Sequence, residues 1–189
     1  MKVLVACEFS GVVRDAFARL GHFAVSCDIL PSAVKGKHYQ GDVMDIIDHH
    51  DWDLMIAHPP CTFLAVSGAR WWSDRKPEQE AAERFFLALA EAPIDRICIE
   101  NPIGKMSGWR KPDQIVQPWQ FGHGETKATC LWLKNLSKLE PTEVVEGRIP
   151  RIHHESPGIK NGMTRQQRRS ITYQGIADAM AEQWGGNAG

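Results

Sequence analysis

Cys61 and Glu100 are the two side chains of this 189-residue sequence whose settings best suit covalent chemistry. Cys61 follows Pro59-Pro60, and because two prolines stiffen a loop, they would present the thiol in a fixed direction. A cysteine placed in this way is a candidate nucleophile, whose thiolate fraction nearby helix N-termini or cations would raise. Glu100 follows the apolar run Ile97–Ile99, where a carboxyl group in a partly dry cleft has a raised pKa and can donate a proton near neutrality. Two plainer interpretations remain open: Cys61 as a small loop residue, and Glu100 with Asn101 as a helix-capping pair.

Three further sites have residue types that suit a nucleoside ligand. Phe9-Ser10-Gly11 combines a small residue with a glycine, which lets the backbone approach a ligand closely and open a helix. Asp28 lies 17 residues beyond Gly11, and an acid in this position can bind both hydroxyls of a ribose. Asp42, directly before Val43, could accept a hydrogen bond from an adenine amino group. Each site also has a structural alternative: a tight strand-to-helix turn, a helix cap and a turn aspartate.

The elements that must position these residues are short buried strands separated by helices. Apolar runs without alternation are typical of strands covered on both faces. The predicted strands are Val3–Cys7, Phe23–Cys27, Leu54–Ala57, Ile97–Ile99 and Thr129–Leu133. Helical spacing predicts helices over Val12–Leu20, closed by Gly21, over about Arg75–Glu91, capped by Ser73 or Asp74, and over about Ile176–Trp184. Such alternation favours a three-layer α/β fold with a mostly parallel sheet, in which ligands bind at the carboxyl ends of the strands.

Length and composition indicate an ordinary globular protein. A chain of this length predicts a single domain over residues 1–189. The net charge of −1 excludes a polybasic mode of nucleic-acid binding for the chain as a whole. The longest apolar runs are shorter than the ~18–20 residues that a membrane span requires, so no membrane partner is expected. Five widely spaced cysteines without a CxxC pair predict a reducing, cytoplasmic compartment, and no histidine pair has a second ligand pair at zinc spacing, so no metal is expected.

One region, residues 148–169, differs in composition from the rest. It contains six Lys or Arg residues and a single acid, Glu155, together with several glycines and prolines. We interpret it as a basic surface loop.

The order and spacing of these sites resemble the S-adenosylmethionine-dependent DNA cytosine-5 methyltransferases. Phe9-Ser10-Gly11 is similar to the Phe-x-Gly cofactor loop of that family, and Pro59-Pro60-Cys61 is similar to its Pro-Cys nucleophile motif. Glu100-Asn101-Pro102 resembles the family's Glu-Asn-Val, and Glu125–Thr129 stands in the place of its Gln-x-Arg-x-Arg strand. The resemblance covers most of residues 1–135 and, more weakly, 171–185.

The resemblance implies a Rossmann-like methyltransferase sheet, S-adenosylmethionine as cofactor and DNA, double- or single-stranded, as partner. It implies catalytic roles for Cys61, Glu100, Asn101 and Lys127, and cofactor binding by Phe9, Ser10, Gly11, Asp28, Asp42, Val43 and Pro59. In the implied reaction the Cys61 thiolate attacks C6 of cytosine, Glu100 donates a proton or a strong hydrogen bond to N3, and Lys127 assists near O2. The methyl group then moves to C5, and loss of the C5 proton releases Cys61. A base in a duplex must leave the stack for this chemistry.

The sequence departs from the family pattern in several places. His58 stands where a small residue is common, Thr62 replaces Gln, Pro102 replaces Val, and Lys127 replaces Arg, which removes a planar bidentate donor. The largest departure is the short interval 136–170, a basic insert where family members carry a separate target-recognition domain. We expect the DNA-contacting residues to be Arg70, Arg148, Arg151, Arg165, Arg168 and Arg169, with an affinity that falls as salt rises.

Other functions remain open at this stage. An amino-methyltransferase acting on adenine N6 or cytosine N4 would use a motif that His58–Cys61 partly resembles, but it would leave Glu100 unexplained. A degenerate, non-catalytic module that binds nucleic acid or a partner protein would explain the missing recognition domain. A free nucleotide could also replace DNA as the substrate, and a homodimer is an open assembly. A compact enzyme of the inferred type suits a mobile or viral genome that masks its DNA from nucleases, as in restriction-modification.

Overall fold

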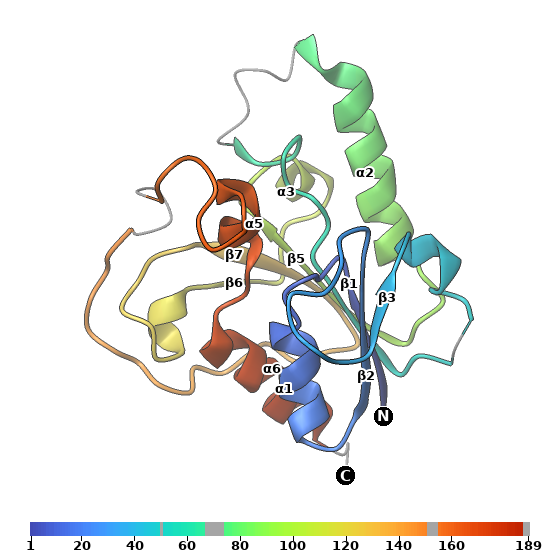
Figure 1. The fold of residues 1–189 in the computed structure, drawn as a ribbon, viewed down its shortest axis with the longest axis horizontal. Coiled ribbons are helices and arrows are strands. Elements are labelled where there is room, and N and C mark those ends of the chain that lie inside the picture. Colours follow the sequence, from blue (N-terminus) through green and yellow to red (C-terminus); the bar gives the residue numbers. More distant parts are fainter. Residues whose placement is uncertain (50, 67–73, 151–154, 187–189) are drawn as a thin grey trace.

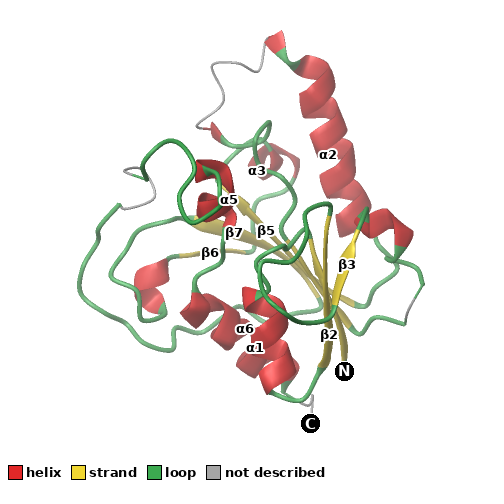
Figure 2. Cartoon of the chain, viewed as in Figure 1, coloured by secondary structure: helices red, strands yellow, loops and turns green. Residues whose placement is uncertain are grey.

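A central sheet with helices on both faces organises the molecule (Figures 1 and 2). The computed structural model describes residues 1–49, 51–66, 74–150 and 155–186. In this part of the chain seven strands pair in the order β3-β2-β1-β4-β5-β7-β6. They are β1 (Lys2–Ala6), β2 (Phe23–Asp28), β3 (His38–Gln40), β4 (Leu54–Ala57), β5 (Arg96–Pro102), β6 (Gln114–Val116) and β7 (Thr129–Lys134).

The sheet is parallel from β3 to β5, and β5, β7 and β6 pair antiparallel. The predicted α/β class, with a mostly parallel Rossmann-like sheet in three layers, is therefore confirmed. All five predicted strands are present: Leu54–Ala57 has the predicted bounds, and the ends of the other four differ by at most three residues. The two strands that the sequence did not predict, β3 and β6, have three residues each, which is too short for a recognisable hydrophobic pattern.

The strands carry two cores because their side chains alternate between the two faces. Val3 and Val5 pack with α1 (Val12–Arg19) and α6 (Gln174–Gly185), whereas Leu4 and Ala6 pack in the core on the α2 (Lys76–Ala90) side. Figure 1 shows α1 and α6 side by side on one face of the sheet and α2 on the other. Burial on both faces explains why β1 is continuously apolar.

The helix boundaries follow local signals with one exception. Gly21 closes α1 as predicted: it has a φ of 83°, its N–H donates to Ala18 O, and the next N–H, of His22, donates to Phe17 O. The predicted cap of α2 is wrong for Asp74, because Arg75 occupies the N-cap position without a side-chain hydrogen bond. Ser73, the other predicted cap, lies outside the described residues.

The insert 136–170 packs against the sheet domain along part of its length. Its first half runs beside residues 119–126, where Gly122 N donates to Glu143 O at 2.8 Å and Thr126 N donates to Ile149 O at 3.1 Å. Near its end it forms the short helix α5 (Arg165–Ser170). Further short helices in the described residues are the 3-10 turns Val43–Asp45 and Pro118–Gln120 and the helix α3 (Met106–Trp109). None of the described helices is long and apolar enough to cross a bilayer.

Candidate active site

The predicted nucleophile and acid lie at the ends of two neighbouring strands. Strands β4 and β5 are parallel partners, and the loop with Pro59-Pro60-Cys61 follows the first, while Glu100 lies near the end of the second. The Cys61 carbonyl accepts hydrogen bonds from the N–H groups of Leu64 and Ala65, at 3.0 and 2.9 Å, so a tight turn fixes the cysteine. The Cys61 residue is exposed, whereas Pro59 is buried. Cys61 is therefore an exposed residue on an anchored loop.

The electrostatic setting of Cys61 differs from the expectation of an enriched thiolate. Desolvation by the surrounding protein and the charge of Glu100 raise the pKa of the thiol, whereas Lys127 and Arg169 lower it. The raising effects prevail, so the free protein holds Cys61 mainly as a thiol at neutral pH. This corrects the prediction: the two cations are present, but they do not ionise the thiol by themselves.

Glu100 makes a close contact that the sequence did not predict. Its Oε2 atom lies 2.7 Å from Nδ1 of His58, and both side chains are largely buried, with 13% and 8% exposure. Burial raises the pKa of Glu100, but the His58 hydrogen bond, the Lys127 charge and a hydrogen bond from Thr129 together lower it below its ordinary value. The predicted raised pKa is therefore wrong, because the expectation omitted partners from the loop after β4, from β7 and from the segment before β7.

His58 is consequently a site residue that the sequence reading treated only as a departure. Its second ring nitrogen, Nε2, is buried and has no hydrogen-bond partner among the described residues. Because the first nitrogen faces Glu100, His58 bridges the acid and a position that a further polar group could fill. The sequence signal that could have identified His58 as a site residue is its position directly before Pro59-Pro60-Cys61.

Asn101 joins the two strand ends. Its side chain is 2% exposed, and Nδ2 donates a hydrogen bond of 2.8 Å to the carbonyl oxygen of Pro59. The Asn101 side chain thus joins strand β5, which carries Glu100, to the loop that carries Cys61. This side-chain hydrogen bond to the backbone therefore helps to fix the position of Cys61 relative to Glu100.

Lys127 reaches the same place from the segment before β7. Its Nζ donates to the backbone carbonyl of Arg169 at 3.0 Å, and it lies 5.9 Å from the ring centroid of Tyr173. The charge of Lys127 lowers the pKa of both Cys61 and Glu100. The structure thus brings three of the predicted catalytic side chains within electrostatic reach of one another.

The first strand-to-helix turn is built around a buried carboxylate, Glu8, that sequence reasoning missed. Its Oε1 accepts hydrogen bonds from Val13 N at 2.7 Å and from the Ser10 hydroxyl at 3.1 Å, and Oε2 accepts from Arg14 N at 3.2 Å. Glu8 thereby satisfies the free N–H groups at the start of α1. Gly11 is the N-cap with a φ of 77°, a conformation that favours glycine. Phe9 and Ser10 are each 8% exposed, so any ligand would meet mainly the backbone here.

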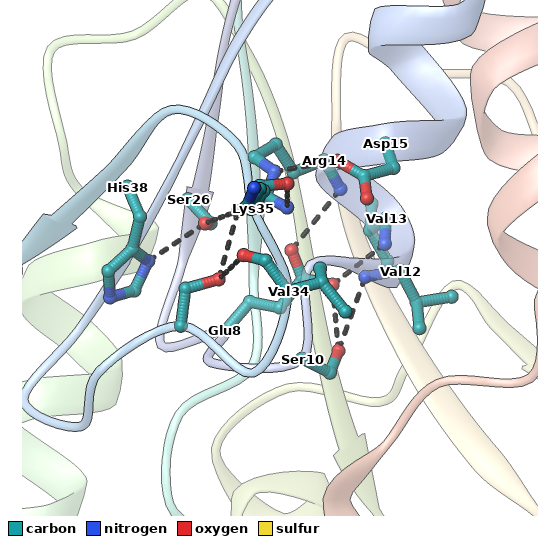
Figure 3. A network of polar contacts seen from close by, with 11 residues as sticks. Glu8, Ser10, Val12, Val13, Arg14, Asp15, Ser26, Val34, Lys35 and His38 are labelled. Atoms are coloured by element: carbon teal, nitrogen blue, oxygen red, sulfur yellow. Dashed lines mark hydrogen bonds and ion pairs between the residues drawn. The ribbon is translucent and has the colours of Figure 1, made fainter.

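A second missed residue, Arg14, fixes the loop that follows β2 (Figure 3). The residue is 1% exposed, and its guanidinium donates to the hydroxyls of Ser26 and Ser32 and to the carbonyl of Lys35, each at 3.1 Å. A Cβ on Gly11 would lie 2.4 Å from Nη2 of Arg14, and one on Gly36 would lie 2.3 Å from Cζ. The two glycines therefore make room for a buried arginine.

The two predicted nucleoside-binding acids lie at the ends of β2 and beyond β3. Asp28 Oδ1 accepts a hydrogen bond from Leu30 N at 2.9 Å, and burial raises the pKa of this carboxyl group despite that bond. Asp42 Oδ1 accepts from Met44 N at 3.0 Å and caps the 3-10 turn, as the turn-aspartate alternative proposed. The Val43 side chain is 3% exposed in the core, which leaves only its backbone to a ligand. Both acids raise the pKa of the nearby Cys7, so they share one neighbourhood.

The predicted DNA-contacting arginines divide into two groups. Arg70 and Arg151 lie outside the described residues. Arg148 lies 3.9 Å from the ring centroid of Trp119, and Arg165 Nε donates to Glu155 O at 2.8 Å. Arg148 Nη1 also donates to the carbonyls of Val145 and Gly147, so this guanidinium is partly committed to the insert.

Arg168 is committed to the insert itself. Its guanidinium bonds the Glu155 carboxylate at 2.8 Å and the carbonyls of Ser156, Gly158 and Met163, and its side chain is 10% exposed. The expectation that Arg168 contacts phosphate is therefore corrected: it holds the loop together. Within the described residues, no three His, Cys, Asp or Glu side chains are grouped as metal ligands would be.

Comparisons with known proteins bear on the fold. No family model and no curated protein matches the chain. Among solved structures, a proposed DNA modification methyltransferase encoded within a prophage (E. coli) matches with a TM-score of 0.54 and 18% identity, over 84% of this chain and 56% of that one. A triple mutant of Spodoptera frugiperda DNMT2 matches with a TM-score of 0.46 and 16% identity, over 78% of this chain and 54% of that one.

The chain thus spans little more than half the length of the structures it matches. At such low identity, the first likeness shows a shared fold. With the strand order above, it follows that the protein has the α/β fold of the prophage-encoded DNA modification methyltransferase.

Proposed function

We propose that this protein transfers a methyl group from S-adenosylmethionine to C5 of cytosine in DNA, with Cys61 as the nucleophile. The observation that carries the proposal is the meeting of Cys61, Glu100 and Lys127 at the ends of β4, β5 and the segment before β7. These are a nucleophile, an acid and a cation, which is the set that the cytosine ring requires. The free cysteines support a reducing, cytoplasmic compartment.

The residues beside the first strand-to-helix turn fit the cofactor. Gly11 presents backbone without a side chain at the start of α1, and Asp28 offers a half-buried carboxylate at the end of β2. Such an acid suits the two hydroxyls of a ribose. Asp42 lies nearby, because the charges of Asp28 and Asp42 both raise the pKa of Cys7. S-adenosylmethionine, when bound there, supplies an electrophilic methyl group on a sulfonium.

The reaction proposed for the chain's own residues follows from their order around the base. The Cys61 sulfur forms a bond to C6, and the ring electrons move toward C5 and N3. Glu100 meets N3 with a proton or a strong hydrogen bond, and Lys127 stabilises the charge on O2. After C5 has received the methyl group, it loses its proton to a base, and the C6–S bond breaks to release the Cys61 thiolate.

The pKa shifts add a requirement to this scheme. The free protein holds Cys61 as a thiol and Glu100 as a carboxylate, which is the reverse of the reactive pair. A proton must therefore move from sulfur toward Glu100 when the base binds. His58, hydrogen-bonded to Glu100, is placed to share that proton.

A covalent trap tests the proposal. DNA with 5-fluorocytosine cannot lose a proton from C5, so the wild-type chain with S-adenosylmethionine should form an adduct stable to denaturing electrophoresis. Cys61→Ser should abolish both the adduct and methyl transfer, and Glu100→Gln should slow transfer by about 10²–10⁴-fold. Methyl incorporation into duplex DNA, single-stranded DNA and dCMP should be compared, because the substrate form is itself part of the proposal.

An amino-methyltransferase is the second candidate, favoured by the HPP turn and by the raised pKa of Cys61. Such an enzyme needs no thiolate, so Cys61→Ser would largely retain methyl transfer. Full transfer by Cys61→Ser would contradict the cytosine-5 mechanism. A chain that binds DNA without any transfer or adduct would instead be the non-catalytic module.

A further inference from the structure

Helix α5, at the end of the insert, lies directly against the cysteine loop (Figure 1). Gln166 Nε2 donates to the hydroxyl of Thr62, the residue after Cys61, at 2.9 Å. At the other end of the helix, the Arg169 carbonyl accepts the 3.0 Å hydrogen bond from Lys127. These two bonds join α5 to the loop that carries the proposed nucleophile and to the proposed catalytic cation.

The helix is braced independently of the site. Thr164 and Gln167 form a reciprocal capping box, in which each side chain accepts a hydrogen bond from the other residue's backbone N–H. Arg168 ties the helix to residues 155–163 through the four hydrogen bonds described above. Helix α5 is therefore fixed both to the rest of the insert and to the loop that carries Cys61. A helix held at both places can keep one of its side chains in a fixed position.

Arg169 is the side chain that this support presents. Its Nε is buried and has no hydrogen-bond partner among the described residues. Its charge acts on Cys61, and no carboxylate of the described residues forms an ion pair with it. A buried donor without a partner is unfavourable for the free protein, so a ligand oxygen at this position would satisfy it.

We propose that Arg169 contacts the nucleotide undergoing modification, donating through its guanidinium to an oxygen of that nucleotide, either O2 of the base or a flanking phosphate. This inference rests on the proposed function. It gives the insert a role at the reacting centre in addition to a general attraction for DNA. It also supplies the planar donor that Lys127 cannot provide, from an element distant in sequence.

The experiment compares Arg169→Met, Arg169→Lys and a control, Lys138→Met, which removes one exposed positive charge from the insert. Thermal melting by circular dichroism first establishes that each variant is folded. The readouts are the single-turnover rate of adduct formation on 5-fluorocytosine DNA and the DNA dissociation constant at several salt concentrations. Arg169→Met should lose at least tenfold in one readout, Arg169→Lys should recover part of it, and Lys138→Met should match wild type.

The two sources of the oxygen give different patterns. A contact with O2 lowers the rate of adduct formation and leaves the salt dependence of binding unchanged. A contact with phosphate weakens binding and reduces the slope of log K against log salt by about 1. A folded Arg169→Met that equals Lys138→Met in both readouts overturns the inference alone. A wild-type chain that forms no adduct and transfers no methyl group overturns the proposed function, and the inference with it.

Discussion

Nδ1 of His58 lies 2.7 Å from Oε2 of Glu100, so the residue that precedes the cysteine turn holds the acid of the neighbouring strand. The contact crosses from the end of β4 to β5 and keeps the pKa of Glu100 below its ordinary value, in spite of the burial that raises it. A resemblance based on Glu100 alone would identify the acid but would miss His58, the partner that lowers its pKa.

Removing His58 should therefore reverse the shift at Glu100. In His58→Gln, burial would outweigh the remaining partners, and the pKa of Glu100 would rise. The rate of single-turnover methyl transfer should be measured as a function of pH. The limb of this profile that reports protonated Glu100 should move to higher pH. His49→Gln, at an exposed histidine, is the control and should leave the profile unchanged. An unshifted profile in His58→Gln would show that His58 does not govern Glu100.

The same contact makes a prediction for stability. Because the folded-state pKa of Glu100 lies below the unfolded value, its ionisation stabilises the fold above the unfolded pKa, and this contribution is lost as pH falls through the folded pKa. Urea unfolding of wild type should show the loss as pH decreases through the acid range. His58→Gln should flatten this dependence, whereas an equally steep curve in the variant would assign it to other carboxyl groups.

Cys61 should react as a thiol with a raised pKa, which can be tested without substrate. Alkylation by iodoacetamide, followed by mass spectrometry, should be slow at neutral pH and accelerate only as pH rises above the ordinary range for cysteine. Glu100→Gln should accelerate it by removing a repelling charge, and Lys127→Met should slow it. Cys27, Cys98 and Cys130 are buried with raised pKa values, that of Cys27 to about 12, so they serve as internal controls. Rapid labelling of Cys61 at neutral pH would contradict this account.

Arg14 should matter for stability and for the cofactor together. Arg14→Met leaves the hydroxyls of Ser26 and Ser32 and the Lys35 carbonyl without their buried partner, and should cost about 3 kcal/mol in urea unfolding. Arg19→Met, on the same helix, breaks only an exposed pair and should cost less than about 1 kcal/mol.

The loop that Arg14 fixes directly follows Asp28, the last residue of β2, so the KM for S-adenosylmethionine should rise about tenfold in Arg14→Met, with a smaller effect on kcat. A loss of stability equal to that of Arg19→Met would show that the network contributes little. If the folded Arg14→Met variant has an unchanged KM for S-adenosylmethionine, the Arg14 hydrogen bonds do not contribute to cofactor binding.

The tie between Asn101 and Pro59 should appear in the chemical step. Asn101→Asp places a carboxylate against the Pro59 carbonyl and should lower kcat about tenfold or more, with a small change in DNA affinity. Gln183→Ala removes two hydrogen bonds of the same length between α6 and the Glu140 backbone and should leave kcat unchanged. Equal kcat values in the two variants would mean that the cysteine loop is positioned by other contacts.

The sequence could predict the strands and the strand-end residues because both depend on local pattern. Each buried strand is a continuous apolar run, and parallel strands bring their carboxyl ends to one edge, which places Cys61 and Glu100 together. Gly21 was predictable for the same reason, since it ends a local helical pattern with the one residue type that favours its φ.

What the sequence did not predict depends on contacts between distant residues. Arg14 bonds partners 12 to 21 residues away, and on its own helix it looks like an ordinary polar position. His58 and Glu100 are 42 residues apart, so the sign of the Glu100 pKa shift could not be deduced from either segment. Arg168 was interpreted as free because its acceptors are mostly backbone carbonyls, which no sequence pattern reveals.

The division of the core between the two faces of the sheet has a consequence for synthesis on the ribosome. The apolar cluster on the α2 face is composed of residues up to 132, whereas the cluster on the α1 face needs Leu139 and the apolar side of α6, up to Trp184. A nascent chain can therefore close one face long before the other. We expect ribosome-stalled chains that end before α6 to expose the α1 face to chaperones and proteases, and chains that include α6 to be protected. Synthesis of α6 would then be the step that completes the second core and protects it.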